Sequence, residues 1–384
     1  MNPSLLNAYE PSDISALEYA PLGEGYVLHS RISGAILLSN AIGLTLYQHL
    51  QAGKNRHEIA QQMAGELELS EREADSLYVD ITQSWKTAGL LDTHKPPFPN
   101  PVIYQPLRKP YDTFTLGYGQ QFVTIKCADQ MLTSHLLEAL QHYQCEEPNE
   151  TATIISISSI DDGFGIFVDQ HPVWEQCNRD MARNLVLREV ATILCGTTET
   201  GALLHAGCVA NTTKNCLIIT HKSGYGKSTL TAGLVAAGLD YLADDLLPLH
   251  KEGQSVISFP APLALKQGAW NLAEAKSLGF EASAPEELPR KGVIYRNIPN
   301  SLPLGTRANV SAIIFPYFDK NNQNSLTRLS PETALHKLIE AGGRTNREHP
   351  SIRPMARLLN HAPAYALNYS SSGYSIQTCL ELLT

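Results

Sequence analysis

The pattern of hydrophobic and polar positions predicts a small α+β module at the start of the chain. Apolar runs at residues 25–29 and 34–38 each begin with glycine, which is typical of the two strands of a hairpin. Apolar side chains then recur every three or four residues, which indicates helices at about residues 41–50, 56–67 and 70–88. Asn40 is the predicted cap of the first helix, and Ser70 with Glu73 predicts a capping box at the start of the third. A hairpin followed by three helices is a winged-helix-like arrangement.

A proline-rich stretch separates this module from the rest of the chain. Residues 96–101 contain four prolines, and such a segment is extended and cannot continue a helix. We therefore predict an N-terminal domain at residues 1–93, a linker at residues 94–110 and a second domain at residues 111–384. We expect few contacts across this boundary.

The second domain alternates apolar runs with helical spacings, which predicts an α/β fold. It divides into an N-terminal part, residues 111–200, and a catalytic core, residues 201–384; residues 111–204 carry no recognisable chemistry. The predicted strands lie at about residues 122–126, 152–157, 165–168, 217–220, 241–243 and 310–315. The predicted helices lie at about residues 133–143, 178–194 and 227–236, and another begins at Ser330-Pro331.

A strand, a tight turn and a helix follow one another at residues 217–236, as the Walker A motif requires. The turn has the second glycine, the lysine and the serine of that motif, but His221 stands in place of its first glycine. Lys227, expected on the surface of the loop, would reach the β- and γ-phosphates, and Ser228 would bind Mg²⁺. The residues predicted to cradle a nucleotide are Ser223, Gly224, Tyr225, Gly226, Lys227, Ser228 and Thr229. The alternative is an ordinary strand-to-helix turn with an exposed lysine.

Two adjacent carboxylates form a second candidate feature. Asp244 and Asp245 follow the apolar run at residues 241–243, at the end of a predicted strand where ligands bind in open α/β sheets. One carboxylate can hold Mg²⁺, and the other can take a proton from an attacking hydroxyl. The alternative is a pair of turn or helix-capping aspartates.

Three segments in this order resemble the catalytic domain of HPr kinase/phosphorylase. They are His-Ala-Gly-Cys-Val at residues 205–209, the loop at residues 223–228, and Ala-Asp-Asp at residues 243–245, with Gly238 between the last two. The chain departs from the family at His221 and at Ala206, where the family usually has glycine after the histidine, and the family's C-terminal signature segment is not evident.

The resemblance implies a P-loop kinase domain that uses ATP and Mg²⁺ to phosphorylate a serine hydroxyl on a protein. It also implies that Lys227 and Ser228 hold phosphate and metal, and that Asp244 and Asp245 divide the base and metal roles. His205 would support the two carboxylates. From the residues alone, this histidine lies in an apolar run, which favours a core residue over a catalytic one.

Further cations are candidates for contacts to the transferred phosphate. Lys266 ends an apolar run, and Arg290 and Lys291 lie in a polar segment that could close over the site. Ordinary solvated loop charges are the alternative for the last two.

The N-terminal module resembles PqqD, a small peptide chaperone, over about residues 15–92. The similarity lies at residues 23–28, 34–40 and 88–91, with an apolar helical set between them. Related domains bind the leader of a ribosomally made precursor peptide as an added strand beside the last hairpin strand. That implies an open edge at Ala35, Ile36, Leu37 and Leu38, with pockets from Leu77, Ile81 and Trp85. The alternative for these last three side chains is that they fill the module's core.

Charge argues against nucleic acid as a partner of this module. Up to Asp92 the chain has five basic and twelve acidic residues, and the third predicted helix carries Glu71, Glu73, Asp75 and Asp80. Nucleic-acid affinity depends on neutralising phosphates, so this surface would repel DNA or RNA.

Composition indicates the compartment. The seven cysteines are scattered without a CxxC pair, which favours reduced thiols in a cytoplasm. No apolar run reaches the roughly 18–20 residues that span a bilayer, and the first residues lack the features of a signal peptide. We expect a cytoplasmic protein without a membrane partner.

Together these features predict an ATP- and Mg²⁺-dependent kinase that phosphorylates a Ser or Thr hydroxyl of a precursor peptide, which it recruits by the leader. Two alternatives stay open: a non-catalytic peptide carrier whose loop binds nucleotide weakly, and a winged-helix regulator with a nucleotide-sensing domain. The sequence does not decide which residue of which peptide is modified, or whether the chain forms a homo-oligomer.

Overall fold

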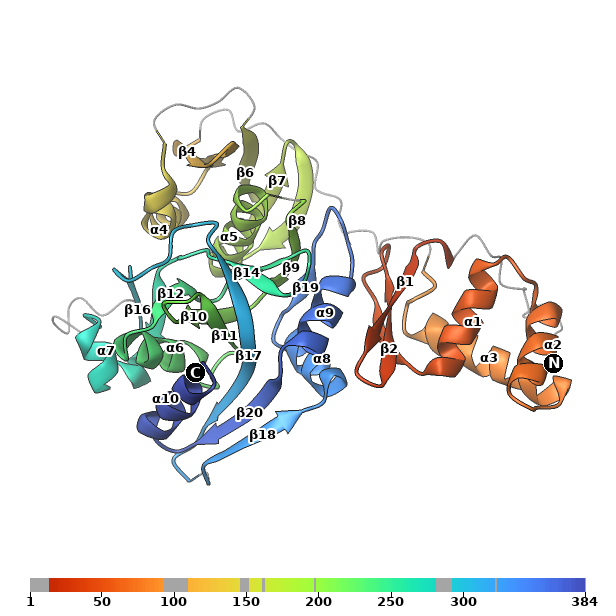
Figure 1. Cartoon of the computed structure of the whole chain (residues 1–384). Helices are drawn as coiled ribbons and strands as arrows, with labels where there is room; N and C mark the ends of the chain where they lie inside the picture. The colour runs from red at the N-terminus through yellow and green to blue at the C-terminus, as the bar shows by residue number, and fades with distance from the viewer. Residues whose placement is uncertain are drawn as a thin grey trace.

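The computed structural model describes residues 14–92, 110–145, 152–160, 163–196, 198–280, 292–321 and 323–383. Within these residues the chain is an α/β protein with mixed sheets (Figure 1). Most of the predicted linker, together with Arg290 and Lys291, lies outside the described residues. No helix in the described ranges is both long and apolar enough to cross a membrane.

The N-terminal module has the predicted hairpin and helices. β2 (Gly25–Ser30) and β3 (Ile36–Ser39) pair antiparallel, and α1 (Ala41–Gln51), α2 (Arg56–Glu66) and α3 (Glu71–Thr87) follow. The side chains of Asn40, Asn55 and Ser70 cap the three helices, and the predicted capping box at Ser70 is confirmed. A strand that the sequence pattern did not indicate, β1 (Leu17–Leu22), pairs with β2 on the side away from β3.

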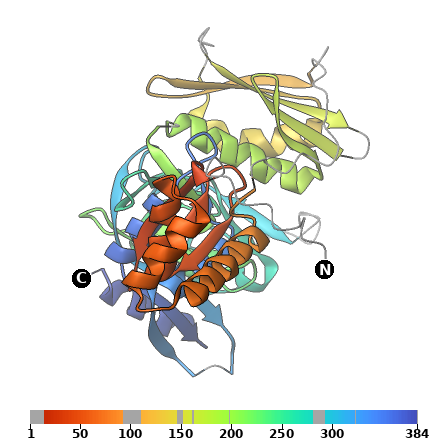
Figure 2. The ribbon, with the colours of Figure 1, turned by 90° about the vertical axis from the view of Figure 1, so that its right-hand side faces the viewer.

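The sheet of this module is covered on both faces. Leu17 and Leu28 point to the helices of the module and share its core, whereas Ala20 and Val27 point the other way. The second pair packs in one cluster with α8 (Pro331–Glu340) and α9 (Arg353–His361) of the C-terminal core, residues 201–384. Figures 1 and 2 show the module lying against these two helices.

A buried carboxylate reinforces this interface. Glu18 on β1 is 2% exposed and accepts hydrogen bonds from His29 Nδ1 and Ser351 Oγ, each at 3.2 Å, and from the N–H of Ile352 just before α9. Asn360 on α9 donates a hydrogen bond to the carbonyl of Pro21 in β1 and accepts one from the N–H of Gly23 in the turn that follows. The expectation of few contacts across the boundary is therefore wrong, because the linker composition says nothing about how β1 packs.

The N-terminal part of the second domain is a sheet with helices on one face. Its strands run in the order β4 (Asp112–Tyr118), β5 (Gln121–Cys127), β6 (Thr153–Ile160), β7 (Gly163–Val168) and β8 (His171–Cys177). The helices α4 (Gln130–Leu140) and α5 (Arg179–Leu194) lie between this sheet and the core, as Figure 2 shows. Their cluster includes Ile257, Phe259 and Ala261 of the core, so the two parts pack together.

The C-terminal core is built on a mixed sheet that runs β12-β10-β11-β17-β14-β13-β9-β19, with β20 on β17 and β18 on β20. β11 (Asn215–Thr220), β17 (Arg307–Phe318) and β20 (Ala364–Tyr369) are parallel. β10 (Ala206–Ala210) is antiparallel to both β11 and β12 (Asp240–Ala243), so β12 runs in the same direction as β11. The remaining strands are β9 (Thr200–Leu204), β13 (Leu247–His250), β14 (Ser255–Ile257), β18 (Ser325–Leu329) and β19 (Arg344–Thr345).

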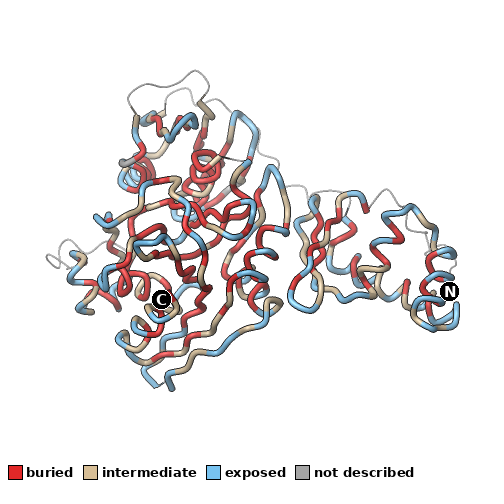
Figure 3. Tube along the Cα trace, viewed as in Figure 1, coloured by how far each residue is buried: buried red, intermediate tan, exposed pale blue. Residues whose placement is uncertain are grey.

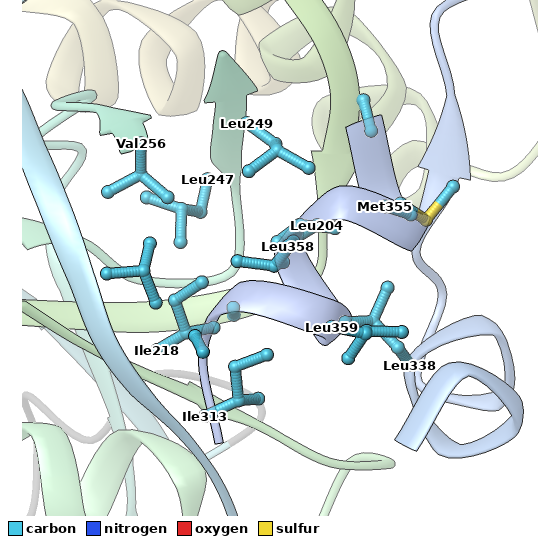
Figure 4. Close-up of a cluster of buried hydrophobic side chains, with 14 of the residues drawn as sticks. Leu204, Ile218, Leu247, Leu249, Val256, Ile313, Leu338, Met355, Leu358 and Leu359 are labelled. Carbon is cyan, nitrogen blue, oxygen red and sulfur yellow. The ribbon is translucent and has the colours of Figure 1, made fainter. Parts of the chain in front are cut away.

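Helices cover both faces of this sheet. α6 (Lys227–Ala236), α7 (Ala273–Ser277) and α10 (Ser372–Glu381) pack on one face, and α8 and α9 pack on the other. Figure 4 shows part of the cluster on the face covered by α8 and α9, where Ile218 and Ile313 from the sheet meet Leu358 and Leu359 from α9. Buried positions concentrate along the sheet strands (Figure 3). Because β11 and β12 run in the same direction, their carboxyl ends meet at one edge, next to the start of α6.

Candidate active site

The predicted phosphate loop connects β11 to α6. The strand ends at Thr220 and the helix begins at Lys227, so strand, loop and helix follow in the predicted order. Gly224 and Gly226 both have a φ of +96°, a left-handed conformation that glycine adopts without strain. No described side chain caps the start of α6, so its first N–H groups lack a side-chain acceptor. A phosphate is a suitable partner for such groups.

His221 stands where the Walker A pattern has its first glycine. Its φ is not in the left-handed region, so this position does not need the conformational freedom of glycine. The imidazole stacks on the ring of Tyr225, with centroids 4.0 Å apart. The histidine therefore introduces no backbone strain into the loop.

The position of Lys227 differs from the one predicted from the sequence. It was predicted on the surface of the loop, but only 6% of its side chain is exposed. Nζ lies 3.3 Å from Asp244 Oδ1 and also donates to Asp245 Oδ1. Burial alone would lower the pKa of Lys227, but the two carboxylates raise it above its ordinary value, so the ammonium stays charged. The sequence could not show that α6 starts against the end of β12.

Asp244 is the inner carboxylate of the pair. It is buried, and its Oδ1 accepts a hydrogen bond from Ser228 Oγ at 3.2 Å. Its Oδ2 accepts from the N–H of Ala264 at 3.4 Å. Burial raises the pKa of Asp244 above its usual range, and the charge of Asp245 adds to this effect while Lys227 opposes it.

Asp245 is the outer carboxylate and faces His205. Its Oδ1 lies 3.4 Å from His205 Nε2, so the predicted neighbourhood of these two groups is confirmed. Desolvation alone would raise the pKa of Asp245, but Lys227 and His205 lower it to about 2. Asp245 also has a φ of +65°, a left-handed conformation that is uncommon for a residue with a side chain and is frequent at functional sites.

His205 is held by its backbone between β9 and β10. Its carbonyl accepts a hydrogen bond from Thr220 Oγ1 at 2.9 Å, which ties it to the end of β11. Burial and the charge of Lys227 lower the pKa of His205, while Asp245 opposes them, so the imidazole is neutral near pH 7. This histidine thus belongs to the carboxylate cluster and is not an isolated core residue.

The oxygen donors beside the loop fit Mg²⁺. Ser228 Oγ and Asp244 Oδ1 are neighbours, and hydroxyl and carboxylate oxygens are the ligands that this hard cation prefers. Over the described ranges no group of three or more His, Cys, Asp or Glu side chains forms a complete metal site. Such a pair is suited to Mg²⁺ that also binds substrate phosphates, because this ion usually takes only one or two protein ligands and keeps several waters.

A cavity of about 1300 Å³, not foreseen from the sequence, is lined mainly by residues of α4 and α5 and also by Lys266 near the loop. Along one wall β15 (Leu263–Lys266) runs from Asp244 to the loop, where Lys266 Nζ donates to Ser223 Oγ at 3.1 Å. The predicted position of Lys266 near the phosphates is consistent with this contact. Arg183 of α5 lines the opposite wall and lies over the ring of Tyr295, 4.5 Å from its centroid. No local motif marks Arg183, because only the packing of α5 on the core brings it here.

The second predicted site lies between β3 and α3. No described strand pairs with the outer edge of β3. Ser30 N–H donates to the carbonyl of Ala35, and pairing alternates along an antiparallel strand, so Leu37 pairs with β2. The N–H and C=O groups of Ile36 and Leu38 therefore point to the open edge.

A groove of about 530 Å³ lies along this edge. Five predicted peptide-binding residues line it, namely Leu37, Leu38, Leu77, Ile81 and Trp85. Trp85 is also buried in the module's core, so it forms the floor of the groove. Two others differ from the prediction: Ala35 precedes β3, and the side chain of Ile36 packs toward the C-terminal core.

Comparison with known proteins adds no assignment to this geometry. No protein-family model matches the chain, and no curated protein sequence matches it significantly.

Proposed function

We propose that the chain is an ATP- and Mg²⁺-dependent kinase that phosphorylates a Ser or Thr hydroxyl of a ribosomally made precursor peptide. The core would be a P-loop kinase domain of the HPr kinase type, preceded by a PqqD-like module. One observation carries the proposal: Lys227 and Ser228 of the loop converge with Asp244, Asp245 and His205 at the same edge of the sheet. A strand-to-helix turn without function would not need a buried lysine between two aspartates.

The two carboxylates have environments that suit different roles. Asp244 is buried beside Ser228, so we assign it and the serine to Mg²⁺. Mg²⁺ bound there would neutralise charge on the β- and γ-phosphates. Asp245 is exposed and close to His205, so we assign it to the acceptor hydroxyl.

The acceptor oxygen would form a bond to the γ-phosphorus while the bond from that phosphorus to the bridging oxygen breaks. Asp245 would accept the hydroxyl proton, and the neutral His205 would orient the carboxylate. In the structure Lys227 lowers the basicity of Asp245. Phosphates in the loop would compete for the same ammonium, and a weaker ion pair with Lys227 would raise the pKa of Asp245.

The groove of the N-terminal module supports recruitment of the peptide through its leader. An extended segment could add to β3 through the N–H and C=O groups of Ile36 and Leu38, and its apolar side chains would enter the groove beside Leu77 and Ile81. Tethering of the leader would raise the effective concentration of the acceptor residue at the kinase site.

The test is incubation of the protein with ATP, Mg²⁺ and a precursor peptide encoded beside it, followed by mass spectrometry of the peptide. We expect the gain of a phosphoryl group, which should require Mg²⁺ and the leader. Lys227→Met, which keeps the length of the side chain without its charge, is the control. A peptide that stays unmodified under all conditions, while it binds the protein, would instead support a non-catalytic carrier.

A further inference from the structure

The carboxyl end of β17 extends beyond the phosphate loop. β17 pairs with β11 as far as Ile314 and continues beside β20 as far as Phe318, which is opposite Tyr369. The last two residues of the strand, Tyr317 and Phe318, are both aromatic and are 40% and 45% exposed. Exposed aromatic rings thus lie beside the loop, where the parallel strands end.

Phe318 lies on the sheet face that carries α6. Its cross-strand partner Tyr369 is buried in the cluster that includes α6, and the two ring centroids are 5.4 Å apart. A Cβ added to Gly226 would lie 2.7 Å from the Tyr369 hydroxyl and 3.6 Å from Phe318 Cβ. Phe318 is therefore adjacent to Gly226, the residue just before α6, and close to the loop groups that would hold phosphates.

The two sides of the loop differ in chemistry. Asp244 and Asp245 follow β12, and the sheet runs β12-β10-β11-β17, so the carboxylates lie on one side of the loop and Phe318 lies on the other. In an open α/β sheet a ligand binds outside the carboxyl ends of the strands. A nucleotide whose γ-phosphate faces the carboxylates would extend its base away from them, toward β17 and β20.

We propose that Phe318 is the stacking platform for the purine base of the nucleotide whose phosphates occupy the loop. This inference rests on the proposed function and extends it to a base-binding subsite. Aromatic side chains bind bases by stacking on the flat face of the ring, which every base has. The ring of Phe318 is exposed, and its backbone is fixed by pairing with β20.

Tyr317 supplies a matched control on the same strand. Successive residues of a strand point to opposite faces, so Tyr317 points away from α6, and its ring contacts Tyr225 at a centroid distance of 5.4 Å. Tyr225 in turn stacks on His221. Tyr317 thus has similar exposure and size, but its ring packs on Tyr225 of the loop and lies on the face opposite Phe318.

The test compares ADP with pyrophosphate, both with Mg²⁺, by isothermal titration calorimetry on the full chain. Phe318→Ala should weaken ADP binding by about tenfold, in the range found for loss of one base-stacking ring, and should leave pyrophosphate binding unchanged. Phe318→Trp should restore ADP affinity. Tyr317→Ala should change the affinities for both ligands by the same factor.

Several results would overturn the inference. ADP affinity that survives Phe318→Ala, or an equal loss of ADP and pyrophosphate affinity, would show that the ring does not bind the base. A loss of peptide affinity in Phe318→Ala without nucleotide would assign the ring to the peptide instead. If neither ADP nor pyrophosphate binds the wild-type protein, the proposed function fails together with this inference. If Phe318→Ala selectively loses ADP binding but the wild-type protein shows no kinase activity, the result would support the base subsite and not the kinase function.

Discussion

The phosphate loop and the β3–α3 groove are organised in opposite ways. At the loop the charged groups are already paired: Lys227 contacts Asp244 and Asp245, and Asp245 faces His205. At the groove the walls are mainly apolar, and the outer edge of β3 pairs with no other described strand. A site for phosphoryl transfer must fix a few groups accurately, whereas a site for peptide main chain needs only an open strand edge and pockets.

The two sites are nevertheless linked through α8. Leu335 and Leu338 of this helix share a buried cluster with Ala20 and Val27 of the module, and Glu332 lies beside Gly23 between β1 and β2. At its other end Glu340 Oε2 lies 3.2 Å from Lys222 Nζ in the phosphate loop. One helix therefore contacts both the sheet that carries the groove and the loop that would carry the nucleotide.

The largest effect is expected from Lys227→Ala, which tests whether the loop is preorganised by charge. Phosphoryl transfer should fall by at least about 10²–10³-fold, the scale for loss of one electrostatic contact to the transition state. Because Lys227 is buried, its removal should also destabilise the fold by on the order of 3 kcal/mol, since Asp244 keeps a buried charge without its partner. Transfer assays and thermal unfolding would measure the two effects, and wild-type transfer by a folded variant would falsify the loop assignment.

Asp244→Asn and Asp245→Asn should separate the roles of the carboxylates. Each should reduce the rate by at least about 10²-fold. Only Asp244→Asn should also raise the Mg²⁺ concentration needed for half-maximal rate, because Asp244 contacts Ser228. Mg²⁺ titrations of both variants would decide this. Near-normal rates in both would make the pair structural, and a Mg²⁺ shift in Asp245→Asn alone would reverse the assignment.

Glu18→Ala tests whether the module is fixed to the core. It should destabilise the protein by about 3 kcal/mol, because it removes the acceptor for His29 and for the N–H of Ile352 within a buried interface. Glu24→Ala, on an exposed carboxylate in the turn between β1 and β2, is the matched control and should have almost no effect. Denaturant unfolding of the two variants would measure the difference. Equal stability would mean that the interface contributes little.

The stability of the protein in acid should depend on the same carboxylate, Glu18. Burial alone would raise the pKa of Glu18, but hydrogen bonds from His29, Ile352 and Arg31 lower it from 4.5 to about 2. A lowered pKa in the folded state stabilises the fold at pH values above about 4.5, and this contribution, about 3 kcal/mol, is lost as the pH falls toward 2. In Glu18→Gln this part of the acid sensitivity should disappear, whereas an unchanged acid profile would contradict the assignment.

The smallest effect is expected at the edge of β3. Ile36→Pro removes an N–H that points to the open edge, so leader affinity should fall by about tenfold, with a smaller loss of stability than in Leu37→Pro. Leu37→Pro removes an N–H that pairs with β2, so it should destabilise the hairpin itself. Fluorescence anisotropy of a labelled leader and thermal unfolding would separate the two. Unchanged affinity in Ile36→Pro would require another docking mode.

The sequence determined most local features of this protein. The caps at Asn40 and Ser70, the strand–loop–helix order around Lys227, and Asp244 and Asp245 at the end of a strand were all predicted and are present. These features depend on residues close together in the chain, so local periodicity and motif spacing are sufficient to find them.

Only the tertiary structure decided how these pieces meet. β1 contains Pro21 and has a weak pattern, so its strand pairing and its contact with α9 were not evident. The burial of Lys227, the approach of Arg183 to the cavity and the position of Phe318 beside Gly226 all depend on packing between distant segments. Spacing along the chain carries no information on such contacts, because the sheet order and the packing of helices on both its faces set them.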